Sequence, residues 1–235
     1  MKTLGLIGGM SWESTLPYYR FINEAVGRRL GGLHSAKLVL YSVDFAEIER
    51  MQRDDAWDEA GAHLADAART LESAGASLIV LCTNTMHKVA EAIEASVAIP
   101  LLHIADATGV AVRQAGLRRV GLLGTRFTME QAFYRDRLQA RHGLDVIVPD
   151  EADRDTVHRV IYEELCRGRF LDAARTEFCA IIQKLVDGGA EAIILGCTEI
   201  GLLVRADDVT VPLFDTARLH AEHAVAVALD VRPEG

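Results

Sequence analysis

The chain has 235 residues, half of them apolar and a quarter charged, which is the composition of an ordinary globular protein with one large or two small domains. Its formal net charge of −9 and the lack of a Lys/Arg-rich run argue against a nucleic-acid or anionic-membrane partner. We find no signal-peptide pattern and no apolar run long enough to span a bilayer, so we expect a cytoplasmic protein.

Short runs of Leu, Ile and Val alternate along the chain with longer segments of helical period. The helical period is clear over residues 54–73 and 171–187. Strands that are apolar throughout and separated by helices indicate βα units on a parallel sheet. The predicted strands cover residues 4–7, 38–41, 78–81, 120–123, 146–148 and 193–195.

The two halves of the chain resemble each other, which indicates an internal duplication. We therefore expect an α/β fold of two pseudosymmetric parallel-sheet, Rossmann-like lobes, with the active site in the cleft between them. The matched segments are LGLIG (4–8) with VGLLG (120–124), LIVLCT (78–83) with IILGCT (193–198), and VAIPLL (97–102) with VTVPLF (209–214).

Two of the four cysteines, Cys82 and Cys197, end matched apolar strands and precede small polar residues. Such a strand end is a helix-start signal, where free backbone N–H groups bind an anion such as a carboxylate. The same partial positive charge favours a thiolate, so we expect a lowered thiol pKa at both positions. The alternative is that each cysteine is a small buried apolar residue, and we expect that for Cys179, which lies in a helical segment without a duplicated partner.

The sequence offers little support for a cofactor or metal site. Two glycines, Gly8 and Gly9, follow the first strand, but the G-x-G-x-x-G spacing of a dinucleotide site is absent. We expect this turn to line the cleft with backbone amides, with Thr125 at the matching place in the second half. No pair of cysteines or histidines has metal-ligand spacing. His87 and His103 are kept as candidate cleft residues.

The segments IVLCTNTMH (79–87) and IILGCTEIG (193–201) resemble the two signature motifs of the aspartate/glutamate racemase family. The likeness extends over the whole chain, including GLIGGMSWEST near the N-terminus and VPLFDTA near the C-terminus, and is greatest to enterobacterial members described as broad-specificity amino-acid racemases. It implies a two-lobed α/β fold with the substrate between the lobes, no pyridoxal phosphate or other cofactor, and a homodimer.

The resemblance also implies roles and domain limits. Cys82 and Cys197 are expected to be the catalytic pair, with one thiolate removing the α-proton and the opposite thiol delivering one to the other face. The C-terminal strand and helix, from about residue 212, are expected to pack on the first lobe. We therefore assign residues 1–98 and 212–235 to the first lobe and residues 99–211 to the second.

The expected substrate-binding residues come from both halves of the chain. Asn84, Thr85 and Thr198, with Thr125 and Met10 nearby, are expected to stabilise charge at the substrate carboxylate. Glu199 is expected to receive or restrain a proton near Cys197. The full candidate set is Met10, Gln52, Asn84, Thr85, Thr125, Glu164, Thr198 and Glu199, with no metal ligand.

Two departures from the family pattern bear on the substrate. Cell-wall glutamate racemases have a histidine directly after the second Cys-Thr, where this chain has Glu199. Members selective for acidic amino acids have a lysine at the position of Cys166, next to Arg167. If Cys166 holds that position, neutral or mixed substrates are favoured; if Arg167 turns inward, aspartate or glutamate is favoured.

We therefore predict a cofactor-independent amino-acid racemase with a two-thiol, two-base mechanism and broad or neutral side-chain specificity, acting on a small-molecule amino acid. The alternatives are a racemase specific for aspartate or glutamate and a related enzyme on the same scaffold, such as a decarboxylase, a maleate-type isomerase or a hydantoin racemase. A non-catalytic amino-acid-binding protein is an alternative from another class.

Overall fold

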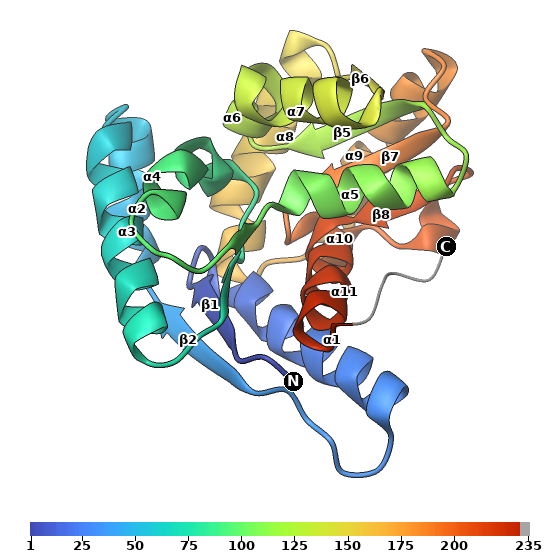
Figure 1. Cartoon of the computed structure of the whole chain (residues 1–235). Helices are drawn as coiled ribbons and strands as arrows, with labels where there is room; N and C mark the ends of the chain where they lie inside the picture. The colour runs from blue at the N-terminus through green and yellow to red at the C-terminus, as the bar shows by residue number, and fades with distance from the viewer. Residues whose placement is uncertain (231–235) are drawn as a thin grey trace. The chain divides into compact units, whose positions relative to one another are not determined.

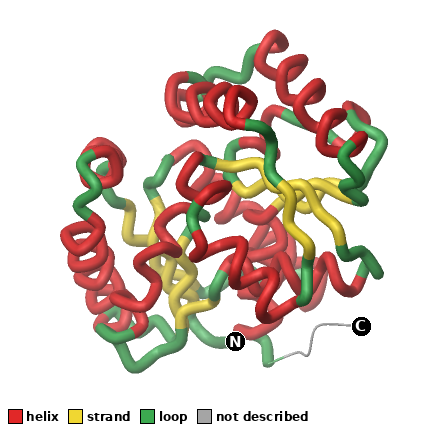
Figure 2. Tube along the Cα trace, turned by 90° about the horizontal axis from the view of Figure 1, so that it is seen from above, coloured by secondary structure: helices red, strands yellow, loops and turns green. Residues whose placement is uncertain are grey.

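The computed structural model describes residues 1–230 and contains two four-stranded parallel sheets with helices, which confirms the predicted α/β fold of two lobes. The chain divides into two compact units: Met1–His103 with the segment from His220 onward, and Ile104–Leu219. Figure 2 shows the two groups of strands, each with helices beside it. None of the helices within residues 1–230 is long and apolar enough to cross a membrane.

The sheet of the first unit has the strand order β2-β1-β3-β4. Its central strands are β1 (Leu4–Gly8) and β3 (Leu78–Leu81), whose residues are all buried. The outer strands are β2 (Leu38–Ser42) and the two-residue β4 (Leu101–Leu102). Burial of both faces explains why the central strands are apolar throughout instead of alternating between apolar and polar residues.

The helices of the first unit pack their apolar faces on this sheet. They are α1 (Trp12–Leu30), α2 (Phe45–Arg53), α3 (Trp57–Ser73), the 3₁₀ helix η1 (Thr85–Val89) and α4 (Ala90–Glu94), together with α11 (Thr216–Ala228) from His220 onward. Figure 1 shows α1 and α11 side by side, and an ion pair from Arg28 Nη2 to Glu222 Oε1 at 2.8 Å links them.

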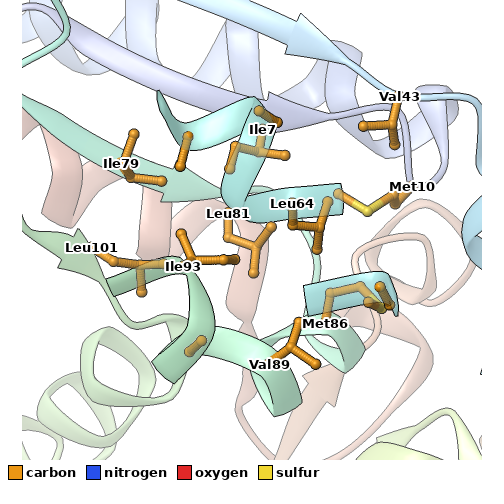
Figure 3. Packing of buried hydrophobic residues seen from close by; sticks show 14 of the residues in the cluster. Ile7, Met10, Val43, Leu64, Ile79, Leu81, Met86, Val89, Ile93 and Leu101 are labelled. Atoms are coloured by element: carbon orange, nitrogen blue, oxygen red, sulfur yellow. The ribbon is translucent and has the colours of Figure 1, made fainter. Parts of the chain in front are cut away.

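One buried cluster ties the sheet of the first unit to the segment after Cys82. Ile7 of β1, Leu81 of β3 and Leu64 of α3 pack together, and Met86 and Val89 of η1 join them (Figure 3). Because two η1 side chains are part of the core, the backbone that follows Cys82 is held firmly in place.

The sheet of the second unit has the order β6-β5-β7-β8. The strands are β5 (Arg119–Gly124), β6 (Asp145–Ile147), β7 (Ala192–Gly196) and β8 (Leu213–Asp215). The helices are α5 (Ile104–Gln114), α6 (Arg126–Glu130), α7 (Ala132–His142), α8 (Glu151–Glu163), α9 (Asp172–Asp187) and α10 (Ile200–Leu203), with short 3₁₀ helices η2 (Leu165–Arg167) and η3 (Ala206–Asp208). The six predicted strands are all present, with small shifts at their ends.

One helix begins later than the sequence predicts. The helical period suggests a start at residue 54, whereas α3 begins at Trp57. Asp54 closes the preceding helix α2, and Asp55 has a φ of 56°, in the left-handed region. A left-handed residue interrupts a right-handed helix, so α2 and α3 are two helices instead of one continuous one.

The fourth strands correct the expected packing of the C-terminal segment. We expected the strand from about residue 212 to pack on the first lobe, but β8 pairs with β7 in the second sheet. Likewise β4, which we placed in the second lobe, pairs with β3 in the first. The matched segments 97–102 and 209–214 therefore each complete the sheet of their own half, because an apolar run beside an open strand edge is buried by pairing there. Residues 231–235, assigned to the first lobe, lie outside the described residues.

Candidate active site

The turn after β3 carries the first predicted catalytic cysteine. We call residues 82–87 the Cys82 turn. Its backbone still follows the sheet at Cys82, whose N–H donates to the Ile7 carbonyl at 2.9 Å. His87 closes the turn through its Nδ1, which lies 2.7 Å from the Thr83 carbonyl oxygen and donates to it. All six side chains of this turn are buried.

Cys82 itself lies fully inside the protein. Its side chain is 0 % exposed, and its Sγ donates to the carbonyl oxygen of Val80 in its own strand at 3.6 Å. Burial raises the pKa of the Cys82 thiol well above its ordinary range. This environment stabilises a neutral thiol.

The turn after β7 carries the second cysteine and has a different set of contacts. We call residues 197–200 the Cys197 turn. The Cys197 thiol donates to Glu199 Oε2 at 3.0 Å, and the Thr198 hydroxyl donates to the same oxygen at 2.8 Å. The other oxygen, Oε1, lies 3.7 Å from the Sγ of Cys166 in η2. A buried carboxylate thus bridges two thiols and a hydroxyl.

The hydrogen-bond registers of the two sheets show which residues correspond. Ile7 pairs with Leu81 in the first sheet, and Leu123 pairs with Leu195 in the second. Since the repeat matches Ile7 with Leu123, Leu81 corresponds to Leu195. The fourth strands give the same correspondence: Ile79 pairs with Leu101, and Ile193 pairs with Leu213.

This register corrects the repeat by one residue. Thr83, two residues after Leu81, occupies the place that Cys197 holds two residues after Leu195, and Cys82 corresponds to Gly196. The exposed fractions agree, since Thr83 is 6 % exposed and Cys197 is 7 % exposed, against 0 % for Cys82. The predicted match of Cys82 with Cys197 is therefore wrong, because an alignment by residue type placed the two cysteines together.

The neighbourhood of Gly196 explains why the register matters for Cys82. A Cβ at Gly196 would lie 2.7 Å from Leu122 Cδ1 and 2.9 Å from the Leu123 carbonyl oxygen. The position that corresponds to Cys82 thus points into packed interior in the second unit. Cys82 is fully buried, whereas Thr83 keeps an exposed fraction of 6 %.

The expected lowering of the thiol pKa is also wrong at both turns. Burial raises the pKa of Cys197, and the adjacent carboxylate of Glu199 raises it further. The partial positive charge at the start of a short helix is small, and α10 has only four residues. Desolvation and a neighbouring negative charge therefore outweigh it.

The other predicted residues of the first unit gather around the Cys82 turn. Asn84 and Thr85 are part of it. The Nε2 of Gln52 in α2 lies 2.9 Å from the Sδ of Met86. Met10 packs in the same apolar cluster as Met86. These contacts place four of the eight candidate substrate-binding residues on or beside one turn.

The candidates of the second unit are less closely grouped. Thr198 and Glu199 contact each other within the Cys197 turn. Thr125 follows Gly124, which pairs with Gly196 beside that turn, and its side chain accepts from the Thr128 N–H at the start of α6. Glu164 closes α8 and lies 3.5 Å from Arg159, with no contact to Cys197 among those the structure gives for the described chain.

Sequence reasoning missed the pairing of Cys166 with Glu199. Cys166 lies in η2, and the next residue of this helix, Arg167, is exposed. The Cys166 thiol donates instead to the buried carboxylate of Glu199. Nothing in the local pattern of residues 161–167 signals that contact, because it joins residues that are 33 positions apart in the sequence.

A buried polar cluster lies behind the Cys82 turn. The Tyr18 hydroxyl donates to His220 Nδ1 at 2.9 Å, and His220 Nε2 donates to the Leu102 carbonyl at 2.8 Å. The rings of His87 and His103 lie 4.4 Å apart, and that of His87 lies 5.9 Å from that of His220. Burial first, and then the neighbouring histidines, lower the pKa of His220 to about 3.

This cluster assigns His87 and His103 a supporting position. His87 donates to the Thr83 carbonyl, and its ring packs against the rings of His103 and His220. Within residues 1–230, no group of three or more His, Cys, Asp and Glu side chains is arranged to hold a metal ion.

Fold and site together define a duplicated α/β protein in which polar turns follow the central strands of two parallel sheets. The family model of the Asp/Glu/hydantoin racemases matches residues 7–224 of this chain. The chain belongs to this family and is an enzyme of the racemase class, which confirms the family and the class predicted from the two motifs.

Individual relatives extend over nearly the whole chain. The broad-specificity amino-acid racemase RacX of Bacillus subtilis is 23% identical over 229 residues, which cover 96% of this chain and 98% of RacX. A candidate Asp/Glu racemase from Yersinia pestis is 58% identical with a TM-score of 0.89, over 97% of this chain and 100% of its own. The aspartate racemase homologue PH1733 of Pyrococcus horikoshii is 34% identical with a TM-score of 0.82, over the same shares.

Proposed function

We propose that the protein interconverts L- and D-amino acids without a cofactor, by moving the α-proton between two polar turns. The observation that carries the proposal is the strand-end thiol of Cys197 on a buried carboxylate, within a chain of the racemase family. Inversion at Cα without a covalent carrier needs a base on one face and an acid on the other. The mechanism therefore requires the Cys82 turn and the Cys197 turn to reach the same Cα.

Proton transfer by positioned groups accounts for part of the rate. Such groups typically contribute ~10²–10⁴-fold. The α-proton of an amino acid is a very weak acid, so the negative charge that develops on Cα and the carboxylate must also be stabilised. We assign that stabilisation to the amides and hydroxyls of Asn84, Thr85 and Thr198, which follow the reacting positions along the chain.

Cys197 is one of the two acid–base groups in this proposal, and two residues compete for the other. In the two-thiol form the second group is Cys82. The sheet register supports Thr83 instead, because Thr83 corresponds to Cys197 and has the same small exposure. A hydroxyl is a weaker acid than a thiol, so a Thr83–Cys197 pair would give different kcat values from the L- and the D-amino acid, while kcat/KM stays equal because the two enantiomers have the same free energy.

The side-chain preference that we propose is broad or neutral. The family resemblance matches Cys166 with the lysine of acid-selective members, and the Cys166 thiol contacts Glu199. Arg167 is exposed. A site for an acidic side chain would need a buried cation, since an unpaired carboxylate is costly to desolvate. A substrate panel tests this preference against specificity for aspartate or glutamate.

The decisive experiment is incubation of the pure protein with single L-amino acids and single D-amino acids in D₂O. We expect loss of the α-proton signal by NMR together with loss of optical rotation. Absence of exchange with every proteinogenic amino acid and with homoserine would contradict the proposal. Turnover of acids or rings that lack the α-ammonium group would favour a decarboxylase, an isomerase or a hydantoin racemase. Thermal stabilisation by an amino acid without turnover would favour a binding protein.

We further propose a homodimer. Three large apolar side chains of α1, those of Trp12, Leu16 and Tyr19, are more than half exposed and share one helix face. Light scattering coupled to size exclusion should give twice the chain mass at micromolar concentration. A Leu16→Glu variant should shift the mass toward that of the monomer, whereas a monomeric wild type would contradict the proposal.

A further inference from the structure

The Cys197 turn contains a charge that its counterpart lacks. Glu199 is 2 % exposed, and its two carboxylate oxygens have different neighbours. Oε2 receives the thiol of Cys197 and the hydroxyl of Thr198, and Oε1 receives the thiol of Cys166. In the first unit the register matches Thr85 with Glu199, so an uncharged side chain takes the place of the carboxylate.

The contact of Glu199 with Cys197 has two opposing effects on the thiol. A carboxylate 3.0 Å away disfavours a second negative charge on sulfur, so the resting group is a protonated thiol. The same carboxylate is positioned to accept that proton, and its transfer leaves the pair with one negative charge throughout. The same contact thus disfavours a thiolate at Cys197 in the resting state and accepts the Cys197 proton during turnover.

We propose that Glu199 exchanges a proton with Cys197 during turnover and that the Cys166 thiol positions Glu199 by holding its second oxygen. Both are positioning residues that act through Cys197. The inference rests on the proposed racemase function, which assigns Cys197 to the reacting α-proton. In this proposal the contacts of Glu199 with Cys166 and Cys197 control the reactivity of Cys197, and the Cys82 turn has no corresponding carboxylate.

The proton movements balance as follows. The S–H bond of Cys197 breaks, an O–H bond forms at Glu199 Oε2, and the bonding electron pair stays on sulfur. The thiolate then takes the α-proton of the substrate, and the electron pair of the Cα–H bond stays on the substrate. After Cα is protonated from the other face, water takes the proton of Glu199 and returns one to the opposite acid.

Cys166 fits the positioning role better than a structural one. It is only partly buried, and it lies on the short η2 helix with its thiol toward Oε1 at 3.7 Å. A donor on Oε1 limits rotation of the carboxylate and so keeps Oε2 directed at Cys197. A serine at this position retains a donor, whereas an alanine does not.

The test compares two readouts for which we expect changes in opposite directions. Glu199→Gln removes the negative charge, so Cys197 should react faster with iodoacetamide at neutral pH, by about ten-fold, because its pKa falls. The same variant should racemise about 10²-fold more slowly, because it cannot accept the proton. Alkylation is followed at each cysteine by peptide mass spectrometry, since the chain has four cysteines.

Cys166 variants provide the second arm. Cys166→Ala should lower racemisation by about three- to ten-fold, the loss expected for one hydrogen bond of ordinary strength. Cys166→Ser should restore it to within about two-fold, because the hydroxyl still donates to Oε1. Cys179→Ser is the matched control: Cys179 is another partly buried helix cysteine, and neither readout should change.

The outcomes separate this inference from the proposed function. If the wild type exchanges no α-proton, the proposed function fails, and the alkylation rates alone still decide whether Glu199 restrains Cys197. If the wild type racemises and Glu199→Gln keeps its rate, the inference is overturned while the function stands. Slower alkylation of Cys197 in Glu199→Gln, or equal loss in Cys166→Ala and Cys166→Ser, also overturns it.

Discussion

The two units share one scaffold but differ at corresponding positions. Each has a parallel sheet whose central strands are buried, apart from the exposed Arg119 at the start of β5, and each ends its third strand in a short polar turn. The Cys82 turn presents Thr83, Asn84 and Thr85, whereas the Cys197 turn presents a thiol, a hydroxyl and a carboxylate. A duplicated fold thus keeps its packing while the strand ends diverge, because the core restrains apolar positions much more than polar ones at the sheet edge.

The comparison predicts that the largest single effect is at Cys197. Replacing it with alanine removes one acid–base group entirely, and racemisation should fall by ~10²–10⁴-fold, the usual contribution of positioned proton transfer. Chiral chromatography of the product measures the rate, and circular dichroism should show an unchanged fold. Wild-type activity in Cys197→Ala would remove the thiol from the mechanism and with it the proposed asymmetry of the two turns.

The next largest effect distinguishes Thr83 from Cys82. Thr83→Val keeps the shape and removes the hydroxyl, and we expect about a 10²-fold loss of racemisation. Cys82→Ala should change the rate much less and should mainly lower stability, since it removes a fully buried side chain. Both rates are measured from the L- and from the D-amino acid. A large loss for Cys82→Ala with near-normal Thr83→Val would restore the two-thiol pair.

Sequence patterns predicted the fold better than the site, for a physical reason. The buried central strands are apolar over nearly their whole length, and the partly buried outer strands β2 and β6 also contain short apolar runs, so each of the six predicted runs was visible in the sequence. The fold class and family followed from those runs and from two motifs. The match of Cys82 with Cys197 was wrong because a register shift of one residue leaves the composition of the matched segments nearly the same. The same shift turns a side chain to the opposite face of the sheet.

Long-range contacts were the other part that the sequence could not supply. The bond from Tyr18 to His220 joins residues at opposite ends of the chain, and that from Cys166 to Glu199 joins two elements without a shared pattern. The matched segments 97–102 and 209–214 did contain the correct register, since Leu101 pairs with Ile79 and Leu213 pairs with Ile193. An alignment based on these segments would have matched Thr83 with Cys197.

The first βα turns sharpen the comparison at the level of stability. Gly9 follows β1 with a φ of +92°, and a Cβ there would lie 2.3 Å from the Val43 carbonyl oxygen. Thr125 holds the matching place after β5 in extended conformation. Gly9→Ala should therefore cost about 2–4 kcal/mol of unfolding free energy, from strain and overlap. Chemical denaturation with urea measures the change.

A second glycine provides the matched control. Gly27 lies in α1, and a Cβ there would meet nothing within 4 Å. Gly27→Ala should leave stability unchanged or raise it by about 0.5–1 kcal/mol, because alanine has the higher helix propensity. Equal destabilisation by the two substitutions would show that the Gly9 turn is not specially restrained.

The smallest predicted effect at neutral pH concerns the buried partners of Tyr18 and Tyr134, which hold matched places in the two units. His220 accepts from Tyr18 in the first unit, and the repeat places Thr108 at the corresponding position near Tyr134 in the second. The folded state holds the pKa of His220 at about 3, below its ordinary value of 6.5. Between these values the unfolded chain binds the extra proton, so stability is complete above about pH 6.5 and falls as the pH is lowered.

A pH series of urea titrations tests this dependence. From pH 7.5 to pH 5.0 the wild type should lose on the order of 1–2 kcal/mol through His220, at about 1.4 kcal/mol per pH unit below the unfolded-state pKa. His220→Gln removes the titrating ring, so it should start less stable by about 1–2 kcal/mol from lost hydrogen bonds and then show a smaller pH slope. His34→Gln, at an exposed histidine, should keep the wild-type slope. An unchanged pH slope in His220→Gln would mean that another group causes the loss of stability at low pH. His220 would then no longer distinguish the first unit from the second.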